Sequence, residues 1–260
     1  MFQLRSSGIR YSWYGISGYE KAVARMVHRY MVDDNQNGAS ANGLQQVLGL
    51  KSYQTAWTWL HKIRTAMLNP NRAKLSGDVE VDETYIGGVE VDGKRGRGTE
   101  NKILVAIATE LATKTPGKKG RRVMGRIRIQ VVEDASAKSL QGFIMENVEL
   151  GSNVITDGWS GYSSLSEKGY QHTIPKKHEA VDENNTMPHV HLLASLLKRW
   201  LLGTHQGAVQ EEHIQAYLDE FVFRFNRRTA AKRGLLFYRL LENAMQTSPT
   251  TYKDLVNHDS

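Results

Sequence analysis

The sequence predicts an α/β fold, in which a mixed β-sheet flanked by helices follows a small all-helical module. Apolar residues recur at helical spacing before Pro70, whereas from Asp78 onward they follow the spacing of β-strands. Three successive strand patterns, followed by alternating helix and strand patterns, are typical of a mixed sheet with helices on its faces. Two long helical patterns complete this part of the chain.

Composition restricts the class of protein. The chain has 260 residues, of which 40% are hydrophobic, so it can bury a sizeable core. It contains no cysteine, which excludes disulfides, thiol catalysis and cysteine-ligated zinc. Its apolar runs are too short to span a bilayer, and its first residues lack the apolar core of a signal peptide. We therefore expect a cytoplasmic protein without a membrane partner. The formal net charge of +7 favours a polyanionic partner.

Residues 1–70 are predicted to form the helical module. Ser40 and Ser52 can each cap a helix, and Gly49 lies in the turn between the two helices. This pattern has two interpretations, an ordinary helical hairpin or a DNA-binding helix-turn-helix. In the second interpretation, exposed side chains of the second helix face a DNA groove, namely Tyr53, Gln54, Thr55, Thr58, Lys62 and Arg64.

Residues 78–228 carry the α/β pattern. The expected strands are 79–86, 103–109, 123–132, 153–156 and 170–174, with a helix at 137–147. Long helices are expected from Pro188 to about 202 and from 209 to 228, with Gly203 ending the first of them. Residues 229–260 are expected to form a C-terminal helical tail.

Two aspartates mark a candidate metal site. Asp82 lies inside the first strand and Asp157 at the end of the fourth, so their carboxylates converge if both strands are central in the sheet. Oxygen ligands of this kind suit Mg²⁺, and two such ions can assist phosphoryl transfer. The alternatives are that Asp157 only shapes a turn and that Glu80 and Asp82 form a solvated strand face.

One face of the helix that begins at Pro188 can complete this site. His191, Ser195 and Lys198 are three and four residues apart, opposite the apolar side of the helix. His191 is placed to reach the carboxylates, as is Glu183 from the preceding loop.

Basic residues cluster on glycine-rich loops and at the end of the last long helix. Such residues can neutralise DNA phosphates, and affinity should then fall steeply with salt. The candidates are Arg95 and Arg97 in the first loop, Lys118, Lys119, Arg121 and Arg122 in the second, and Arg227 and Arg228 after the helix.

Four long motifs resemble the ISXO-type insertion-sequence transposases, a branch of the DDE superfamily with an RNase H-like catalytic domain. They are VDETYIGG (81–88), ITDGWSGY (155–162), HVHLLASLLKRWLLGTHQG (189–207) and YLDEFVFRFNRR (217–228). The resemblance implies a metal-dependent polynucleotidyl transferase that cuts transposon ends and joins them to target DNA. It also implies two Mg²⁺ or Mn²⁺ ions, double-stranded DNA as partner, and a homo-oligomer on that DNA.

The motifs assign residues by position. Asp82 and Asp157 match the first two acids of the family, and His191 falls where related branches have Glu or Asn, seven residues before Lys198. Neutral imidazole is a poorer ligand than carboxylate for Mg²⁺, so His191 either binds a metal or positions water or the scissile phosphate. Lys198 can neutralise a phosphate. Relatives often begin with a cysteine-rich zinc ribbon, which this chain lacks.

Two other functions stay open at this point. One is a catalytically inactive, transposase-derived DNA-binding protein, which the presence of Asp82 and Asp157 disfavours. The other is an RNase H-like nuclease, because the sequence does not separate DNA cleavage from strand transfer.

Overall fold

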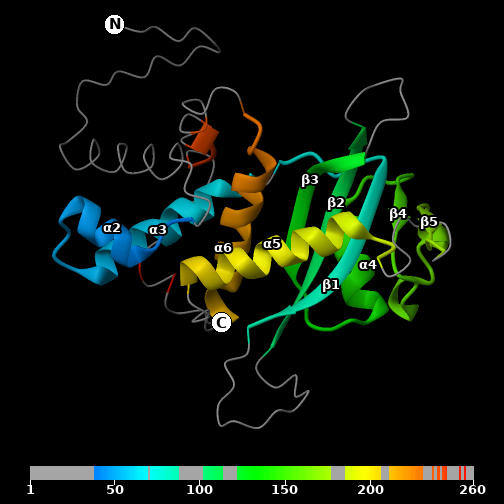
Figure 1. Cartoon of the computed structure of the whole chain (residues 1–260), viewed down its shortest axis with the longest axis horizontal. Helices are drawn as coiled ribbons and strands as arrows, with labels where there is room; N and C mark the ends of the chain where they lie inside the picture. The colour runs from blue at the N-terminus through cyan, green and yellow to red at the C-terminus, as the bar shows by residue number, and fades with distance from the viewer. Residues whose placement is uncertain are drawn as a thin grey trace, which may run out of the picture.

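A computed structural model describes residues 38–69, 71–87, 102–113, 122–176, 185–205 and 211–230, together with 236, 239, 240, 242–244, 252 and 255. Figure 1 shows the helical module at one end of the molecule and the sheet at the other. The expected basic loops, apart from Arg122, lie outside the described residues, as does most of the C-terminal tail.

A five-stranded mixed sheet forms the centre of the larger part, in the order β3-β2-β1-β4-β5. β1 (Asp78–Ile86), β2 (Ile103–Thr113) and β3 (Arg122–Val131) are antiparallel neighbours. β4 (Asn153–Ile155) pairs with β1 in parallel, and β5 (Gln171–Thr173) pairs with β4 in parallel. The predicted mixed sheet is confirmed, and β1 is its central strand.

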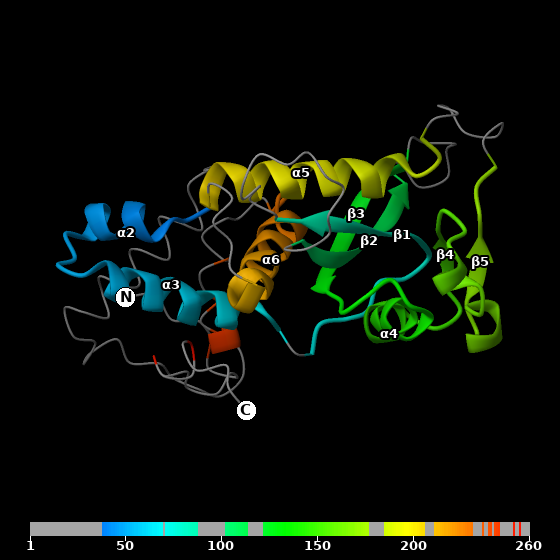
Figure 2. The ribbon, with the colours of Figure 1, turned by 90° about the horizontal axis from the view of Figure 1, so that it is seen from below.

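Alternation along β1 directs side chains to two different layers. Val79 and Val81 are buried against the layer that contains α4 (Ala137–Asn147), whereas Ile86 packs on the opposite side. Figure 2 shows α5 (Pro188–His205) covering one face of the sheet and α4 covering the other. Because successive side chains in a strand point to opposite faces, Glu80 and Asp82 lie on the α5 side.

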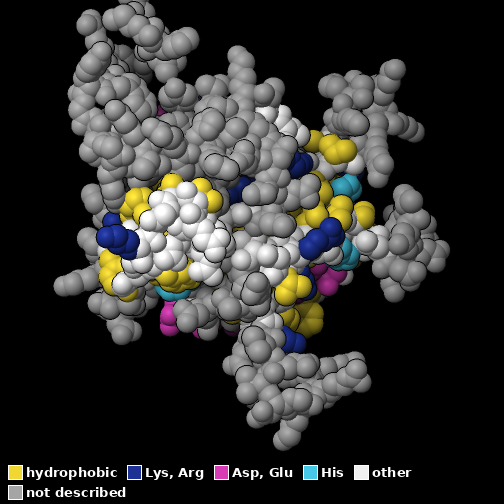
Figure 3. All heavy atoms as spheres, turned by 60° about the vertical axis from the view of Figure 1, so that its left-hand side comes forward, with side chains coloured by type: hydrophobic (Ala, Val, Ile, Leu, Met, Phe, Trp, Pro, Cys, Tyr) yellow, Lys and Arg dark blue, Asp and Glu magenta, His cyan; other side chains and the backbone are white. Residues whose placement is uncertain are grey.

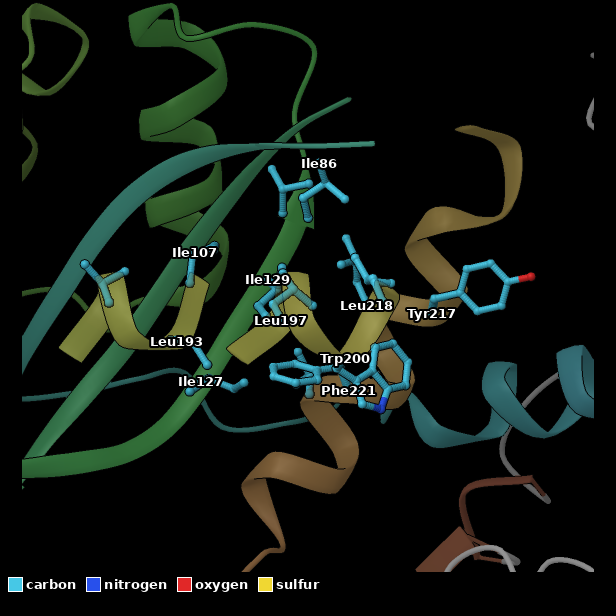
Figure 4. Packing of buried hydrophobic residues seen from close by; sticks show 14 of the residues in the cluster. Ile86, Ile107, Ile127, Ile129, Leu193, Leu197, Trp200, Tyr217, Leu218 and Phe221 are labelled. Carbon is cyan, nitrogen blue, oxygen red and sulfur yellow. The ribbon is translucent and has the colours of Figure 1, made fainter. Parts of the chain in front are cut away.

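The core between the sheet and α5 and α6 (Glu211–Asn226) is built from branched and aromatic side chains. Figure 4 shows isoleucines of the sheet facing α5 and α6, with Ile107, Ile129, Leu193, Leu197, Trp200 and Phe221 among the packed residues. This burial fixes α5 on the sheet. The expected end of that helix at Gly203 is wrong, because α5 continues to His205.

Two short 3-10 helices, Ser160–Tyr162 and Ser166–Lys168, form the connection between β4 and β5.

The helical module consists of α2 (Ala41–Leu48) and α3 (Tyr53–Met67). Gly49 ends α2 in the left-handed region, at φ 64°, and its N–H donates to carbonyls of the last turn. Glycine adopts this conformation without steric strain, which explains the tight turn between the helices.

A buried ion pair joins this module to α6. Arg64 on α3 donates from Nε to Glu220 Oε2 at 2.8 Å, and both side chains are almost fully buried. Glu220 Oε1 accepts from Arg224 Nε at 2.9 Å and from the backbone N–H of Ala39 at 3.3 Å. Burial opposes ionisation of Glu220, but Arg64 and Arg224 hold its pKa below the ordinary value.

The prediction that Arg64 faces a DNA groove is therefore wrong. Arg64 follows the buried Leu60 by one helical turn and shares its inward side of α3. The guanidinium is held by Glu220 and by the carbonyl of Ala39, so it joins two parts of the protein.

Replacing Glu220 by glutamine should reduce the free energy of unfolding by about 3–5 kcal/mol, because it leaves Arg64 buried without a counter-charge. Urea unfolding measures this difference. The matched control is Glu242→Gln, which breaks an exposed pair with Arg239 and should change stability by less than about 1 kcal/mol. Equal effects of the two substitutions would contradict the role of the buried pair.

Candidate active site

The pairing of β1 with β4 brings the two predicted aspartates together. Glu80 is the partner of Ile155 in this parallel ladder, and continuing the register by two residues places Asp82 beside Asp157. The negative charge of Asp157 contributes to the raised pKa of Asp82, which agrees with their proximity. The predicted convergence therefore rests on neighbouring central strands.

His191 reaches the same place from α5. Its Nε2 lies 3.3 Å from Asp82 Oδ2, and its Nδ1 lies 2.6 Å from Asn185 Oδ1. Since an amide oxygen only accepts, Nδ1–H is the donor in that bond, which leaves Nε2 directed at Asp82. The ring is half-buried, so solvent or a ligand can still reach it. Lys198 is exposed two helical turns further along α5.

Asp82 has an unusual electrostatic environment. Burial and the neighbouring charges of Glu83 and Asp157 raise its pKa from 3.8 to about 6, although His191 opposes the shift. A cation bound beside this carboxylate would offset the part of the shift that comes from the neighbouring negative charges. Strongly shifted carboxyl groups of this kind are common at functional sites.

Glu80 fixes the helix that carries His191 to the strand that carries Asp82. Its side chain is buried, with Oε2 accepting from the backbone N–H of Val190 at 2.8 Å. Its Oε1 accepts from His189 Nδ1 at 2.9 Å. A carboxylate at a helix N-terminus satisfies free backbone N–H groups and interacts favourably with the helix dipole. The alternative of a solvated strand face is wrong for Glu80.

The opposite face of β1 supports the segment after Asp157. The Tyr162 hydroxyl donates to Glu83 Oε2 at 2.6 Å, and its ring is fully buried. Burial and this bond raise the pKa of Tyr162, which keeps the hydroxyl protonated as a donor. The contact fixes the start of the β4–β5 connection beneath the site.

The residues fit a divalent metal in part. Among the described residues, no group of three or more His, Asp or Glu side chains is arranged to hold an ion by itself. Mg²⁺, however, is usually bound by one or two carboxylates and keeps several waters and substrate phosphates as its other ligands. Asp82 and Asp157 supply such a pair of carboxylates, whose charges interact.

The other side chains predicted to contact DNA differ in their exposure, and some lie outside the described residues. Tyr53, Gln54 and Lys62 are exposed on α3, while Thr55 and Thr58 are half-buried. Arg95, Arg97, Lys118, Lys119 and Arg121 lie outside the described residues. On the face shown in Figure 3, the Lys and Arg side chains of the described residues are scattered, so the described surface there does not form one basic patch.

Three predicted arginines have structural contacts. Arg122 pairs with Asp78 at 2.8 Å. Arg227 stacks on Phe223 at 3.8 Å, and burial lowers its pKa. Arg228 donates to the carbonyls of Met124, Gly125 and Phe225, which joins the end of α6 to β3. Their contribution to DNA binding stays a prediction.

The sequence patterns did not identify the contact of Asn185 or the anchoring role of Glu80. Asn185 precedes α5 in an irregular segment that gives no periodic signal. Glu80 shares the strand face of Asp82, which was visible in the sequence, but its partners on α5 lie about 110 residues away.

Comparison with known proteins decides the family. Residues 74–226, more than half of the chain, match the family model of the ISXO2-like transposase domain. The chain belongs to the ISXO2-like transposase family. This confirms the resemblance, and the transposase domain spans all five strands together with α4, α5 and α6. No curated protein matches the chain significantly.

Within the described part of the chain, no helix is long and apolar enough to cross a membrane.

Glu80→Ala should reduce the free energy of unfolding by about 1–3 kcal/mol, because it leaves the buried Val190 N–H without its acceptor. Glu80→Gln is the matched control. Its amide oxygen can still accept from Val190, so its effect should be smaller than about 1 kcal/mol. Urea unfolding of both variants measures the difference, and a stable alanine variant would contradict the anchoring role.

Asp82→Asn should stabilise the metal-free protein at pH 7 by about 1–3 kcal/mol and change little at pH 4. The folded-state pKa of about 6 exceeds the ordinary 3.8, so the unfolded chain loses this proton first as pH rises. Wild-type stability should therefore fall between about pH 4 and 6 relative to the variant. Unfolding of both proteins in EDTA at pH 4 and at pH 7 measures this effect. An equal difference in the free energy of unfolding at the two pH values would contradict a raised Asp82 pKa.

Proposed function

We propose that this transposase cuts DNA at the ends of an insertion sequence and joins the freed ends to target DNA, with a divalent metal as cofactor. The observation that carries the proposal is the parallel pairing of β1 with β4, whose continuation leads to Asp82 and Asp157, together with the approach of His191 to Asp82. An inactive DNA-binding derivative has no need for a buried carboxylate with a raised pKa, because that carboxylate reduces the stability of the fold.

Asp82 and Asp157 are the proposed ligands of Mg²⁺ or Mn²⁺, with two ions expected. When bound, such ions neutralise charge on a phosphodiester and lower the pKa of a coordinated water. Asp82 must be ionised to bind, so the proton it holds below about pH 6 would be released on loading. The contacts of Glu80 and Tyr162 hold the two carboxylates in register before DNA arrives.

His191 and Lys198 are proposed to act on the DNA side of this pair. Asn185 orients the imidazole so that Nε2 faces Asp82 and can serve as a ligand or hold the attacking water. Lys198 offers an ammonium group to a phosphate next to the reacting one. Neither group becomes covalently attached to DNA in this scheme.

Two phosphoryl transfers make up the proposed reaction. In the first, water attacks the phosphorus at the transposon end, the 3′-oxygen leaves and takes up a proton, and a 3′-hydroxyl results. In the second, that hydroxyl attacks a target phosphodiester and the target 3′-oxygen leaves. Both steps depend on positioning and on neutralising charge, which are the contributions that lower barriers in phosphoryl transfer.

DNA is proposed to contact the helical module and the basic loops as well as the site. Exposed Tyr53, Gln54 and Lys62 on α3 are candidates for contacts with a DNA groove. Because the ion pair of Arg64 with Glu220 fixes α3 on α6, DNA bound there would have a defined direction relative to the site. Assembly of several copies on DNA is part of the proposal.

Asp82→Asn and Asp157→Asn should each reduce cleavage of a labelled transposon end by at least about 100-fold, while DNA affinity changes by less than about threefold. Each substitution keeps the side-chain shape but removes a ligand charge. Purified protein, Mg²⁺ or Mn²⁺ and DNA flanking the coding sequence are combined, and cut and joined products are resolved on a gel. Joined products separate a transposase from a simple nuclease.

His191→Ala and His191→Glu extend the same assay. Glutamate restores the residue found in related branches, so it should retain more activity with Mg²⁺ than alanine does. Full cleavage by Asp157→Asn would refute the metal-site assignment, whereas equal loss of cleavage and binding would indicate misfolding.

A further inference from the structure

We infer that Trp159 forms a nucleobase-binding platform beside the site, on which a base next to the scissile phosphate stacks. This inference rests on the proposed function and deepens it, because it assigns a contact with the base to Trp159, a residue of the ITDGWSGY motif that has no role in the proposed metal site. The ligand class is an unpaired or terminal DNA base.

The indole of Trp159 is exposed yet held in place. About half of the residue is accessible, although tryptophan usually buries most of its surface. Its Nε1–H donates to the carbonyl of Ala135 at 3.0 Å, which fixes the edge of the ring. Its own carbonyl accepts from the backbone N–H of the buried Tyr162 at 3.0 Å. A ring held by its edge loses little freedom when a flat ligand stacks on it.

Trp159 is also coupled directly to the candidate metal ligand. Its backbone N–H donates to Asp157 Oδ1 at 2.9 Å. Gly158 lies between them with φ 87°, and an added Cβ there would approach Ile174 Cδ1 to 3.2 Å. Ile174 is itself half-exposed, so apolar surface lies on both sides of this turn. A phosphate held beside Asp157 through the proposed metal would therefore bring its own nucleotide next to Trp159.

The sheet explains why these groups meet at one edge. β3, β1, β4 and β5 all run in the same direction, because β2 is antiparallel to both of its neighbours. Trp159 follows the end of β4, Ala135 follows β3, and Ile174 follows β5. Ligands of open α/β sheets commonly bind beyond the carboxyl ends of such strands.

A DNA base is the occupant that fits best. The ring is flat and apolar, and every base offers a π-face that stacks on an aromatic side chain. Bases inside a duplex are already stacked, so only a base that is terminal or displaced can reach the ring. The last base at a duplex end is such a base, and the reaction proposed above creates one where it cuts the chain.

The test measures affinity of the full chain for a fluorescent duplex from the DNA flanking the coding sequence. Ca²⁺, which takes oxygen ligands, replaces Mg²⁺, and a gel verifies that the DNA stays intact. A single abasic site is moved one nucleotide at a time through the duplex end. The proteins compared are wild type, Trp159→Ala, Trp159→Phe and the control Leu150→Ala. Leu150 is 69% exposed and precedes β4, at the opposite end of the same strand.

Trp159→Ala should weaken binding to intact DNA about 10–100-fold, as expected for loss of one base–aromatic stack. At one position, the abasic site should weaken wild-type binding by a similar factor. At that same position it should weaken binding by Trp159→Ala little further, because the stack is already lost. Trp159→Phe should stay within about threefold of wild type, and Leu150→Ala should bind like wild type.

If the loss of affinity from Trp159→Ala and the loss from the abasic site multiplied at every abasic position, the inference would be overturned. That result would show that Trp159 affects binding through the structure and not through any base. Unchanged affinity of Trp159→Ala would overturn it too, as would a change confined to self-association of the protein. The proposed function is judged separately by cleavage in Asp157→Asn. If that variant loses cleavage while Trp159→Ala binds normally, only the inference about the base fails.

Discussion

The parallel pairing of β1 with β4 is the constraint on which the site depends. This short ladder ends with Glu80 opposite Ile155, and the two strands then lead to Asp82 and Asp157, whose charges interact. The antiparallel ladders of β2 and β3 bury β1 from the other side, so the pair lies at the centre of the sheet. A shift of one residue in either strand would turn its aspartate to the opposite face, where α4 packs. The hydrophobic alternation that fills both faces therefore also fixes the chemistry.

The same arrangement opposes stability at the proposed metal site. Asp82 is partly buried near Glu83 and Asp157, and its raised pKa reflects the unfavourable free energy of its ionised form. The structure balances this locally with His191, and it anchors α5 through Glu80 at the helix N-terminus. The larger stabilising terms lie elsewhere, in the isoleucine-rich core under α5 and α6 and in the buried pair of Arg64 with Glu220. Such a division between a strained site and a stable scaffold is common in enzymes.

The spacing of apolar residues predicted the helices and strands well, because that spacing depends on which side of each element is buried. The helix 137–147 and all five strands were predicted, and their order identified the fold class. Contacts between distant segments were not predictable in this way. The helical pattern predicts an exposed Arg64, yet its side chain is buried against Glu220, which lies 156 residues away in sequence. Gly203 was expected to end α5, but packing of the helix on the sheet outweighs the weak helix propensity of one glycine. Asn185 gave no signal because irregular segments have no period.

Titration of the DNA-free protein with Mn²⁺, with free Mn²⁺ followed by electron paramagnetic resonance, tests whether Asp82 and Asp157 together form one metal site. We expect saturable binding to wild type at pH 7, weakening below about pH 6 as Asp82 takes up its proton. We also expect loss of that binding in both Asp82→Asn and Asp157→Asn, with circular dichroism unchanged. Undiminished Mn²⁺ binding in either folded variant would contradict it.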